Sequence, residues 1–354
     1  MADEREYAAA KGWRVSSREK TMPVSKMFAI ALAATVACSA ATTMGSDRIG
    51  RPVRVLSLSF SNQPLEVICN LIDKEAAQGV DLVVLPETWR GQNDNSMETL
   101  DGPTIHAMSA LARKHHTYIV SPIDRIQGNQ RLNSAVLLDR SGKVVFIYNK
   151  VFPYWSEFDH KKKVEPGTSS SSVYQADFGR VGFAICFDVN FPEVWKSLAD
   201  QGAELVVWPS AYSAGTTLQA HALNNHYYIV TSTGARDCIV YDITGEQILY
   251  QKSKDINVTH VTLDLDRGIY HENFNLAKRD KLLREHGDDV EQQEYLEREA
   301  WFVLRARRPG VSARELARQY GLEELRDYID RSRRDIDKMR GWSFSERVDH
   351  TGEN

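Results

Sequence analysis

Gly182-Phe183-Ala184-Ile185-Cys186-Phe187-Asp188 is the stretch from which the fold and the chemistry of this chain are read. The apolar run up to Ile185 predicts a buried strand that delivers Cys186 to its end. Asp188 then supplies turn or N-cap chemistry, and a helical pattern starts near Pro192. A side chain on such a strand-to-helix turn is exposed, and the following backbone N–H groups point toward an oxyanion beside it. Cys186 is therefore a candidate nucleophile, although most free cysteines are small core residues and this segment alone does not separate the two readings.

Three charged side chains upstream also follow predicted strands or lie in the loop beyond one. Residues 81–85 form an apolar run that is followed by Glu87, and residues 144–149 form a second run that ends at Lys150. Glu157 comes shortly afterwards, in a loop rich in aromatic residues. Each charge alone would be an ordinary solvated loop residue. Together with the cysteine they predict a site assembled at the ends of several strands.

These motifs resemble the nitrilase superfamily, the carbon–nitrogen hydrolases. The matching motifs are Leu85-Pro86-Glu87, Tyr148-Asn149-Lys150 with Glu157, and the 182–188 stretch followed by Phe191-Pro192-Glu193. The resemblance covers roughly residues 53–265. It implies a Glu–Lys–Cys triad with a second glutamate, and an α/β fold that is a four-layer α-β-β-α sandwich. It also implies that subunits pair through helices into a homodimer or a higher homo-oligomer.

The chemistry of these four residues can be argued without the resemblance. A thiol with a pKa of about 8.5 is mostly protonated at neutral pH and needs a base or a cationic neighbour. Glu87 would take the Cys186 proton and later deliver it to the departing amine. Lys150 would stabilise the thiolate and the oxyanion, together with backbone N–H groups after the cysteine. Glu157 would hold Lys150 and orient Glu87 or the attacking water.

No cofactor or metal is expected for this reaction. The histidines show no ligand spacing of the kind that holds zinc: they include His115, His116, His160, His221, His226 and His271. Four cysteines in 354 residues do not make a disulfide scaffold, and Cys69 and Cys238 are predicted to be core residues.

The expected substrate is a small molecule that carries a non-peptide C–N bond. A nitrilase usually has Trp-Glu after the cysteine, whereas Phe187-Asp188 resembles the amidase and carbamoylase branches. We therefore expect hydrolysis of a linear amide or N-carbamoyl compound, with nitrile hydrolysis or a non-catalytic scaffold as the alternatives. The candidate pocket residues are Trp89, Tyr154, Trp155, His160, Phe187 and Tyr212.

Composition and pattern fit a layered α/β enzyme. The chain is 42% hydrophobic and 26% charged with a net charge of −4, which argues against broad nucleic-acid binding. Alternating strands and helices predict two sheets, each with helices on one face. The expected strands are 53–60, 81–85, 118–122, 133–138, 143–149, 205–208, 228–233, 237–241 and 260–264. The expected helices are 64–78, 102–114, 218–225 and one from the cysteine turn to 201.

Both ends of the chain lie outside the hydrolase domain, which is placed at residues 51–268. Residues 1–46 form a leader whose apolar part, Met27 to Thr43, follows Lys26 and has the build of a signal peptide if translation starts at Met22. This predicts export to the periplasm or the medium, or anchoring through Cys38. The alternative is a cytoplasmic protein with an alanine-rich surface helix.

The C-terminal extension, residues 275–354, is dense in charged residues. Its periodicity predicts helices over 282–306 and 313–339, with Gly310 between them and Gly321 at a turn within the second. Mixed charge favours a packing arm over a DNA-reading helix-turn-helix. We expect it to stabilise an oligomer or to cap the pocket.

Overall fold

The computed structural model describes residues 49–93, 95–158 and 163–341. The predicted leader, with Cys38, lies outside the described residues, as does His160. In the described part, no helix is both long and apolar enough to cross a membrane.

The first sheet has the strand order β12-β1-β2-β3-β4-β5. Its strands are β1 (Pro52–Ser59), β2 (Leu82–Val84), β3 (Tyr118–Gln127), β4 (Gln130–Leu138), β5 (Val144–Asn149) and β12 (Asn257–Asp264). The central strands β1, β2 and β3 are parallel, and the remaining pairs are antiparallel. The carboxyl ends of the three parallel strands therefore share one edge of the sheet.

The second sheet has the same plan, in the order β11-β10-β9-β8-β7-β6. Its strands are β6 (Val173–Ala176), β7 (Gly179–Phe183), β8 (Leu205–Ser210), β9 (Tyr228–Thr233), β10 (Asp237–Tyr241) and β11 (Gln247–Lys252). Here β7, β8 and β9 are the parallel strands. Cys186 leaves the sheet just beyond β7, at the carboxyl end of this parallel set.

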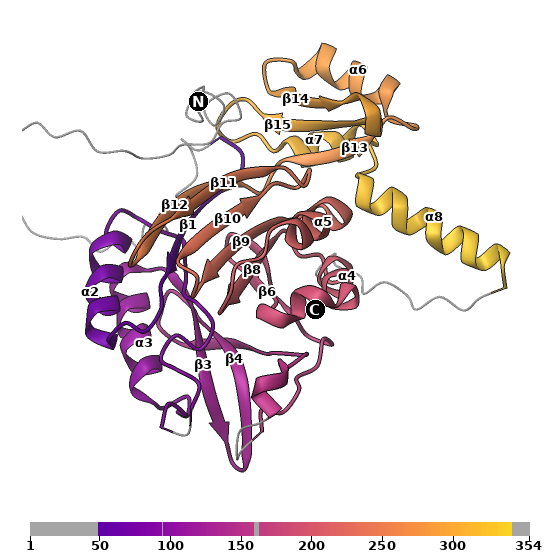
Figure 1. Ribbon diagram of the computed structural model, residues 1–354. Coiled ribbons are helices and arrows are strands. Elements are labelled where there is room, and N and C mark those ends of the chain that lie inside the picture. The colour runs from indigo at the N-terminus through magenta and orange to yellow at the C-terminus, as the bar shows by residue number, and fades with distance from the viewer. Residues whose placement is uncertain (1–48, 94, 159–162, 342–354) are drawn as a thin grey trace, which may run out of the picture.

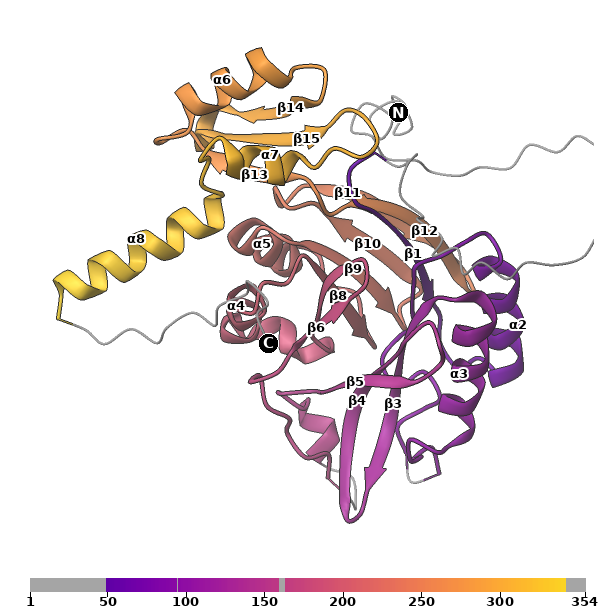
Figure 2. The same cartoon turned by 180° about the vertical axis from the view of Figure 1, so that it is seen from behind.

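Two pairs of helices cover the outer faces of the two sheets (Figures 1 and 2). The helices α2 (Leu65–Ala76) and α3 (Pro103–His115) pack on the first sheet, and α4 (Pro192–Asp200) and α5 (Thr216–Asn225) pack on the second. A further apolar core fills the space between the two sheets. Strands buried on both faces read as continuous apolar runs, which is why the sequence predicted most of them. The fold is the expected four-layer α-β-β-α sandwich.

The hairpin of β3 and β4 is longer than the sequence predicted, because β3 continues through Pro122 to Gln127. A strand with neighbours on both sides uses its backbone N–H groups as donors to both, and proline has no N–H to donate. However, β2 pairs with β3 only as far as Val120, so no neighbouring strand requires a donor from Pro122. The antiparallel pairing with β4 on the other side is unaffected.

The C-terminal extension contains a third sheet as well as helices. Its strands β13 (Gly268–His271), β14 (Val290–Leu296) and β15 (Trp301–Ala306) pair in the order β13-β15-β14. Its helices are α6 (Leu276–His286), α7 (Ala313–Gln319) and α8 (Leu325–Met339). The expected helix over 282–306 is wrong beyond His286, because Phe302, Val303 and Leu304 are consecutive buried residues, which suits a strand and not one face of a helix. The break at Gly321 between α7 and α8 is confirmed, with φ at +73°.

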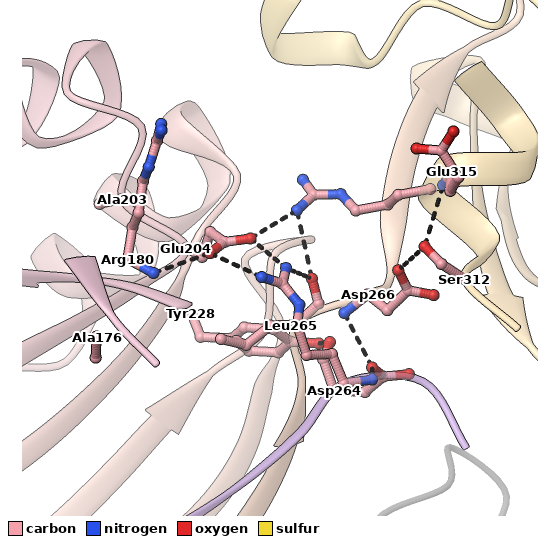
Figure 3. Close-up of polar contacts among 12 residues, drawn as sticks. Ala176, Arg180, Ala203, Glu204, Tyr228, Asp264, Leu265, Asp266, Ser312 and Glu315 are labelled. Atoms are coloured by element: carbon pink, nitrogen blue, oxygen red, sulfur yellow. Dashed lines mark hydrogen bonds and ion pairs between the residues drawn. The ribbon is translucent and has the colours of Figure 1, made fainter. Parts of the chain in front are cut away.

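Figure 3 shows how polar contacts join the extension to the hydrolase domain. Glu204 accepts hydrogen bonds from Arg51 and from Arg314, the latter at 3.0 Å. Asp266 accepts hydrogen bonds from the Ser312 hydroxyl and the Ala313 backbone N–H. The extension is thus held by charged groups of the domain beneath it.

A buried ion pair between Arg267 and Asp242 lies within the domain beside this junction, which Arg267 crosses through a second pair with Glu294 of β14 at 3.1 Å. Replacing Arg267 with methionine leaves the Asp242 carboxylate buried without its main counter-charge, so we expect a loss of about 3–5 kcal/mol in the free energy of unfolding. Chemical denaturation measures this loss. The matched control is Arg318→Met, which breaks an exposed pair with Glu315 and should cost less than about 1 kcal/mol. Equal losses in the two variants would contradict the prediction.

Candidate active site

Cys186 occupies a strained turn directly after β7. It opens a short 3-10 helix (Cys186–Asn190), and its φ of +47° lies in a region that residues other than glycine rarely adopt. The turn is held from both sides: the Ile185 N–H donates to Asp188 Oδ2 at 2.9 Å, and the Trp208 indole donates to the Cys186 carbonyl at 3.1 Å. Such strain persists only where the surroundings enforce it, and here it fixes the direction of the thiol.

Asp188 connects this turn to the segment that carries the lysine. Besides Ile185, its carboxylate accepts from the Tyr148 hydroxyl at 2.8 Å and from the Phe152 backbone N–H at 2.9 Å. Burial raises the pKa of Asp188 to about 6, although all three hydrogen bonds oppose the shift. Tyr148 and Phe152 flank Lys150 in the chain, so Asp188 sets the position of the lysine relative to the cysteine.

Lys150 lies between two carboxylates at the end of β5. Its Nζ is 2.9 Å from Glu87 Oε1 and 2.8 Å from Glu157 Oε2. Burial alone would lower the pKa of Lys150, but the negative charges around it, led by Glu87, outweigh burial and raise the pKa. Lys150 is therefore a permanent cation in a nearly water-free position.

Glu157 is saturated with hydrogen-bond donors. Its Oε1 accepts from Gln92 at 2.6 Å and from Asn133 at 2.9 Å, while its Oε2 accepts from Lys150 and from the Tyr154 N–H at 2.6 Å. Burial alone would raise the pKa of Glu157, but Lys150 and the two amides lower it. A carboxylate with four donors is a poor proton acceptor, so this geometry suits Glu157 to positioning and not to proton transfer.

Glu87 is the carboxylate whose charge acts on the thiol. Its Oε1 accepts from Lys150 and from Asn133 at 2.8 Å, and its Oε2 accepts from the Ala211 backbone N–H at 2.8 Å. The charge of Glu87 acts directly on the Cys186 thiol. Burial, followed by the charge of Glu87, raises the pKa of Cys186 above its usual range, and Lys150 only partly opposes this. The resting cysteine is therefore a neutral thiol.

Replacing Glu157 with glutamine is expected to lower kcat about 100-fold while Cys186 remains open to alkylation. A glutamine side chain can accept on one atom only, so Lys150 or the Asn133 and Gln92 amides lose their acceptor and the lysine shifts. Steady-state kinetics and iodoacetamide labelling, followed by mass spectrometry of the Cys186 peptide, measure the two effects. A wild-type kcat would show that Glu157 has no part in turnover.

The predicted pocket residues divide into two groups. Tyr154, Trp155 and Tyr212 are exposed, and Tyr154 meets the half-buried Phe187 edge to face at 5.1 Å. Tyr154 also contacts Trp155, whereas Tyr212 packs on Trp208, whose indole bonds the cysteine turn. Trp89, in contrast, is buried between the first sheet and its helices and packs edge to face on Phe60 at 5.7 Å, so the structure makes it a packing residue.

Sequence reasoning missed the groups that hold the charged residues in place. Asn133, Gln92 and the backbone N–H of Ala211 each donate to one or both glutamates. Asp188 was read as a turn residue and as a mark of the amidase branch, but not as a link to the lysine segment. For Asn133 a signal existed. It lies within the apolar strand β4, where asparagine is unfavourable unless something bonds its amide.

Comparisons with known proteins agree with this geometry. The model of the carbon–nitrogen hydrolase family matches residues 61–268, which is more than half of the chain. A citrullinase from Francisella tularensis is 24% identical over 292 residues, covering 76% of this chain and 98% of that protein. The mouse omega-amidase NIT2 is 25% identical over 198 residues, or 51% of this chain and 71% of that protein.

Two solved structures share the fold. An amidase from Nesterenkonia sp. aligns over 62% of this chain and 92% of its own, with a TM-score of 0.53 and 24% identity. Nit3 from Saccharomyces cerevisiae, a member of branch 10 of the nitrilase superfamily, aligns over 65% of this chain and 95% of its own, with a TM-score of 0.53 and 19% identity. The strained cysteine, the carboxylates around Lys150 and the family match lead to one conclusion: the chain belongs to the carbon–nitrogen hydrolase family.

Proposed function

We propose that this protein hydrolyses a linear amide or N-carbamoyl compound through a Cys186 thioester, releasing ammonia or an amine. The observation that carries the proposal is the buried cluster in which Lys150 bridges Glu87 and Glu157, beside the strained turn of Cys186. The charges of both Glu87 and Lys150 act on the pKa of the Cys186 thiol. Proton acceptor, nucleophile and fixed cation therefore stand side by side.

In the first half-reaction, the Cys186 proton passes to Glu87 as the sulfur attacks the carbonyl carbon. The carbonyl oxygen becomes an oxyanion, which Lys150 and the backbone N–H groups of the Cys186–Asn190 turn stabilise. Glu87 then gives its proton to the substrate nitrogen and the C–N bond breaks. Ammonia or an amine leaves, and the acyl group stays on sulfur.

The second half-reaction repeats these steps with water. Glu87 accepts a proton from the water as its oxygen attacks the thioester carbon, and the C–S bond breaks. The cysteine thiolate recovers the proton from Glu87, which restores the resting site. Lys150 stabilises the second oxyanion as it did the first. Throughout, Glu157 stays ionised and holds Lys150, consistent with its four donors.

The choice of amides and carbamoyl compounds rests on Phe187-Asp188 and on the relatives. Asp188 is built into the turn through three hydrogen bonds, so this dipeptide is part of the site and not a surface variation. The relatives named above are a citrullinase, named for an amino acid with a terminal carbamoyl group, and an omega-amidase. In a mutant of the Nesterenkonia amidase, the acetamide moiety of fluoroacetamide is added covalently to the active-site cysteine.

The deciding experiment measures ammonia release from a panel of linear amides, N-carbamoyl amino acids and nitriles, with Cys186→Ala as the blank. We expect release from amides or carbamoyl compounds in the wild type only. Release confined to nitriles would replace the proposal with nitrile hydrolysis. Silence across the panel, with Cys186→Ala keeping the biological activity of the wild type, would favour a scaffold protein.

Two further expectations remain predictions. Export rests on the apolar leader alone, and cell fractionation of the full-length protein tests it. A homodimer or higher homo-oligomer rests on the family resemblance, and light scattering of the purified protein tests that.

A further inference from the structure

Asn133 lies in the middle of β4 and touches three of the four proposed catalytic-site residues. Its side-chain nitrogen Nδ2 donates to Glu87 Oε1 at 2.8 Å and to Glu157 Oε1 at 2.9 Å. Its backbone carbonyl accepts from the Lys150 N–H at 2.8 Å. We propose that Asn133 is a positioning residue for hydrolysis, which holds the two glutamates at a fixed separation around Lys150. This inference rests on the proposed function.

The orientation of the amide shows what fixes it. Asn133 is fully buried, and its Oδ1 has no hydrogen-bond partner in the part of the chain that the structure describes. An unpaired buried carbonyl oxygen costs free energy. Turning the amide over would place that oxygen against the oxygens of two carboxylates. This repulsion would cost more free energy than the unpaired oxygen does. The two glutamates therefore determine how Asn133 lies, and the unpaired oxygen is the consequence.

The neutral charge of Asn133 matters for the balance of the site. Two carboxylates that share one site repel each other, and one of them tends to take up a proton. Lys150 bridges Glu87 and Glu157 with a single positive charge, so it can balance only one of the two negative charges. Asn133 adds a second bridge, which shares Glu87 Oε1 with Lys150 but ends on the other oxygen of Glu157, and it brings no charge. The two bridges close a ring of hydrogen bonds that holds both carboxylates in place.

Asn257 provides a matched control. It too is fully buried, with an unpartnered Oδ1 in the described part of the chain, but its Nδ2 donates to Thr259 and to neither glutamate. Asn133→Ser and Asn257→Ser thus remove comparable buried amides. A general packing effect would appear in both variants, whereas an effect on the glutamates would appear only in the first.

For Asn133→Ser we expect kcat on the best amide to fall about 100-fold, with KM changed less than about threefold. Asn133 helps to lower the pKa of Glu157, so its loss raises that pKa and Glu157 is protonated at a higher pH. The acid limb of the pH–rate profile should therefore move to higher pH, by about half a unit or more. Asn257→Ser should keep the wild-type kcat and acid limb. A wild-type acid limb in Asn133→Ser, or equal kcat losses in the two variants, would overturn the proposal.

Two additional measurements keep the test decisive. If Asn133→Ser does not fold, the near-isosteric Asn133→Asp is used, and wild-type turnover by that variant would also refute the proposal. If the wild type hydrolyses no amide, the proposed function fails but Asn133 can still be tested. The side-chain carboxyl ¹³C signal of Glu157, assigned by its absence in Glu157→Gln, should then still titrate at higher pH in Asn133→Ser.

Discussion

Replacing Cys186 with alanine is expected to reduce ammonia release at least about 10⁴-fold without unfolding the protein. The thiol is the only protein group in the proposed reaction that forms a bond to the substrate carbon, so no other side chain of the site replaces it. The fold should persist, because alanine fits the space of the side chain and meets the same backbone strain at a φ of +47°. Steady-state kinetics and thermal unfolding check the two halves of this prediction.

The matched control is Cys238→Ala. Cys238 is also buried, but it lies in β10 within the core between the two sheets. It should lose some stability and keep its turnover. If Cys186→Ala retains more than a few per cent of the wild-type rate, Cys186 is not the nucleophile.

Replacing Glu87 with glutamine is expected to separate turnover from thiol reactivity. Hydrolysis should fall about 1,000-fold, because glutamine cannot accept the thiol proton or deliver it to the leaving nitrogen. The negative charge of Glu87 helps to raise the pKa of Cys186, so removing that charge lowers the pKa and increases the thiolate fraction at pH 8. Alkylation by iodoacetamide should therefore proceed at least as fast as in the wild type.

The measurement is the rate of labelling of the Cys186 peptide across pH 6–10, beside kcat for the best substrate. Glu165→Gln, a change in an exposed loop glutamate, serves as the control and should alter neither quantity. A parallel loss of hydrolysis and labelling in Glu87→Gln would mean that Glu87 chiefly holds the cysteine turn in shape.

The sequence predicted the residues that lie at strand ends. Glu87 and Lys150 each follow an apolar run that forms a strand of the first sheet, and Cys186 follows one that forms a strand of the second. Strand ends of this kind are where sites form in α/β folds. The four-layer arrangement and the place of Glu157 in the site came from the family resemblance. That resemblance could name these residues because they belong to its motifs.

The bridging contacts could not be predicted in the same way. Asn133 reaches Glu87 because β4, which carries Asn133, lies next to β3 in the sheet. It reaches Glu157 because the loop after β5 folds back over β4. Both contacts depend on the lateral order of strands, which local periodicity does not encode. Likewise, the strands β14 and β15 form because they pair with each other and with β13, although their many charges resemble a helical surface.

The pairing of β1 with β12 has a consequence for biosynthesis. The backbone N–H of Arg51, just before β1, donates to Asp264 at the end of β12, 213 residues later. A ribosome therefore releases β1 long before its edge partner exists, and the unpaired edge is open to association with other nascent chains. Translation speed and chaperone supply, and not the intrinsic stability of the finished enzyme, should then limit the yield of soluble protein.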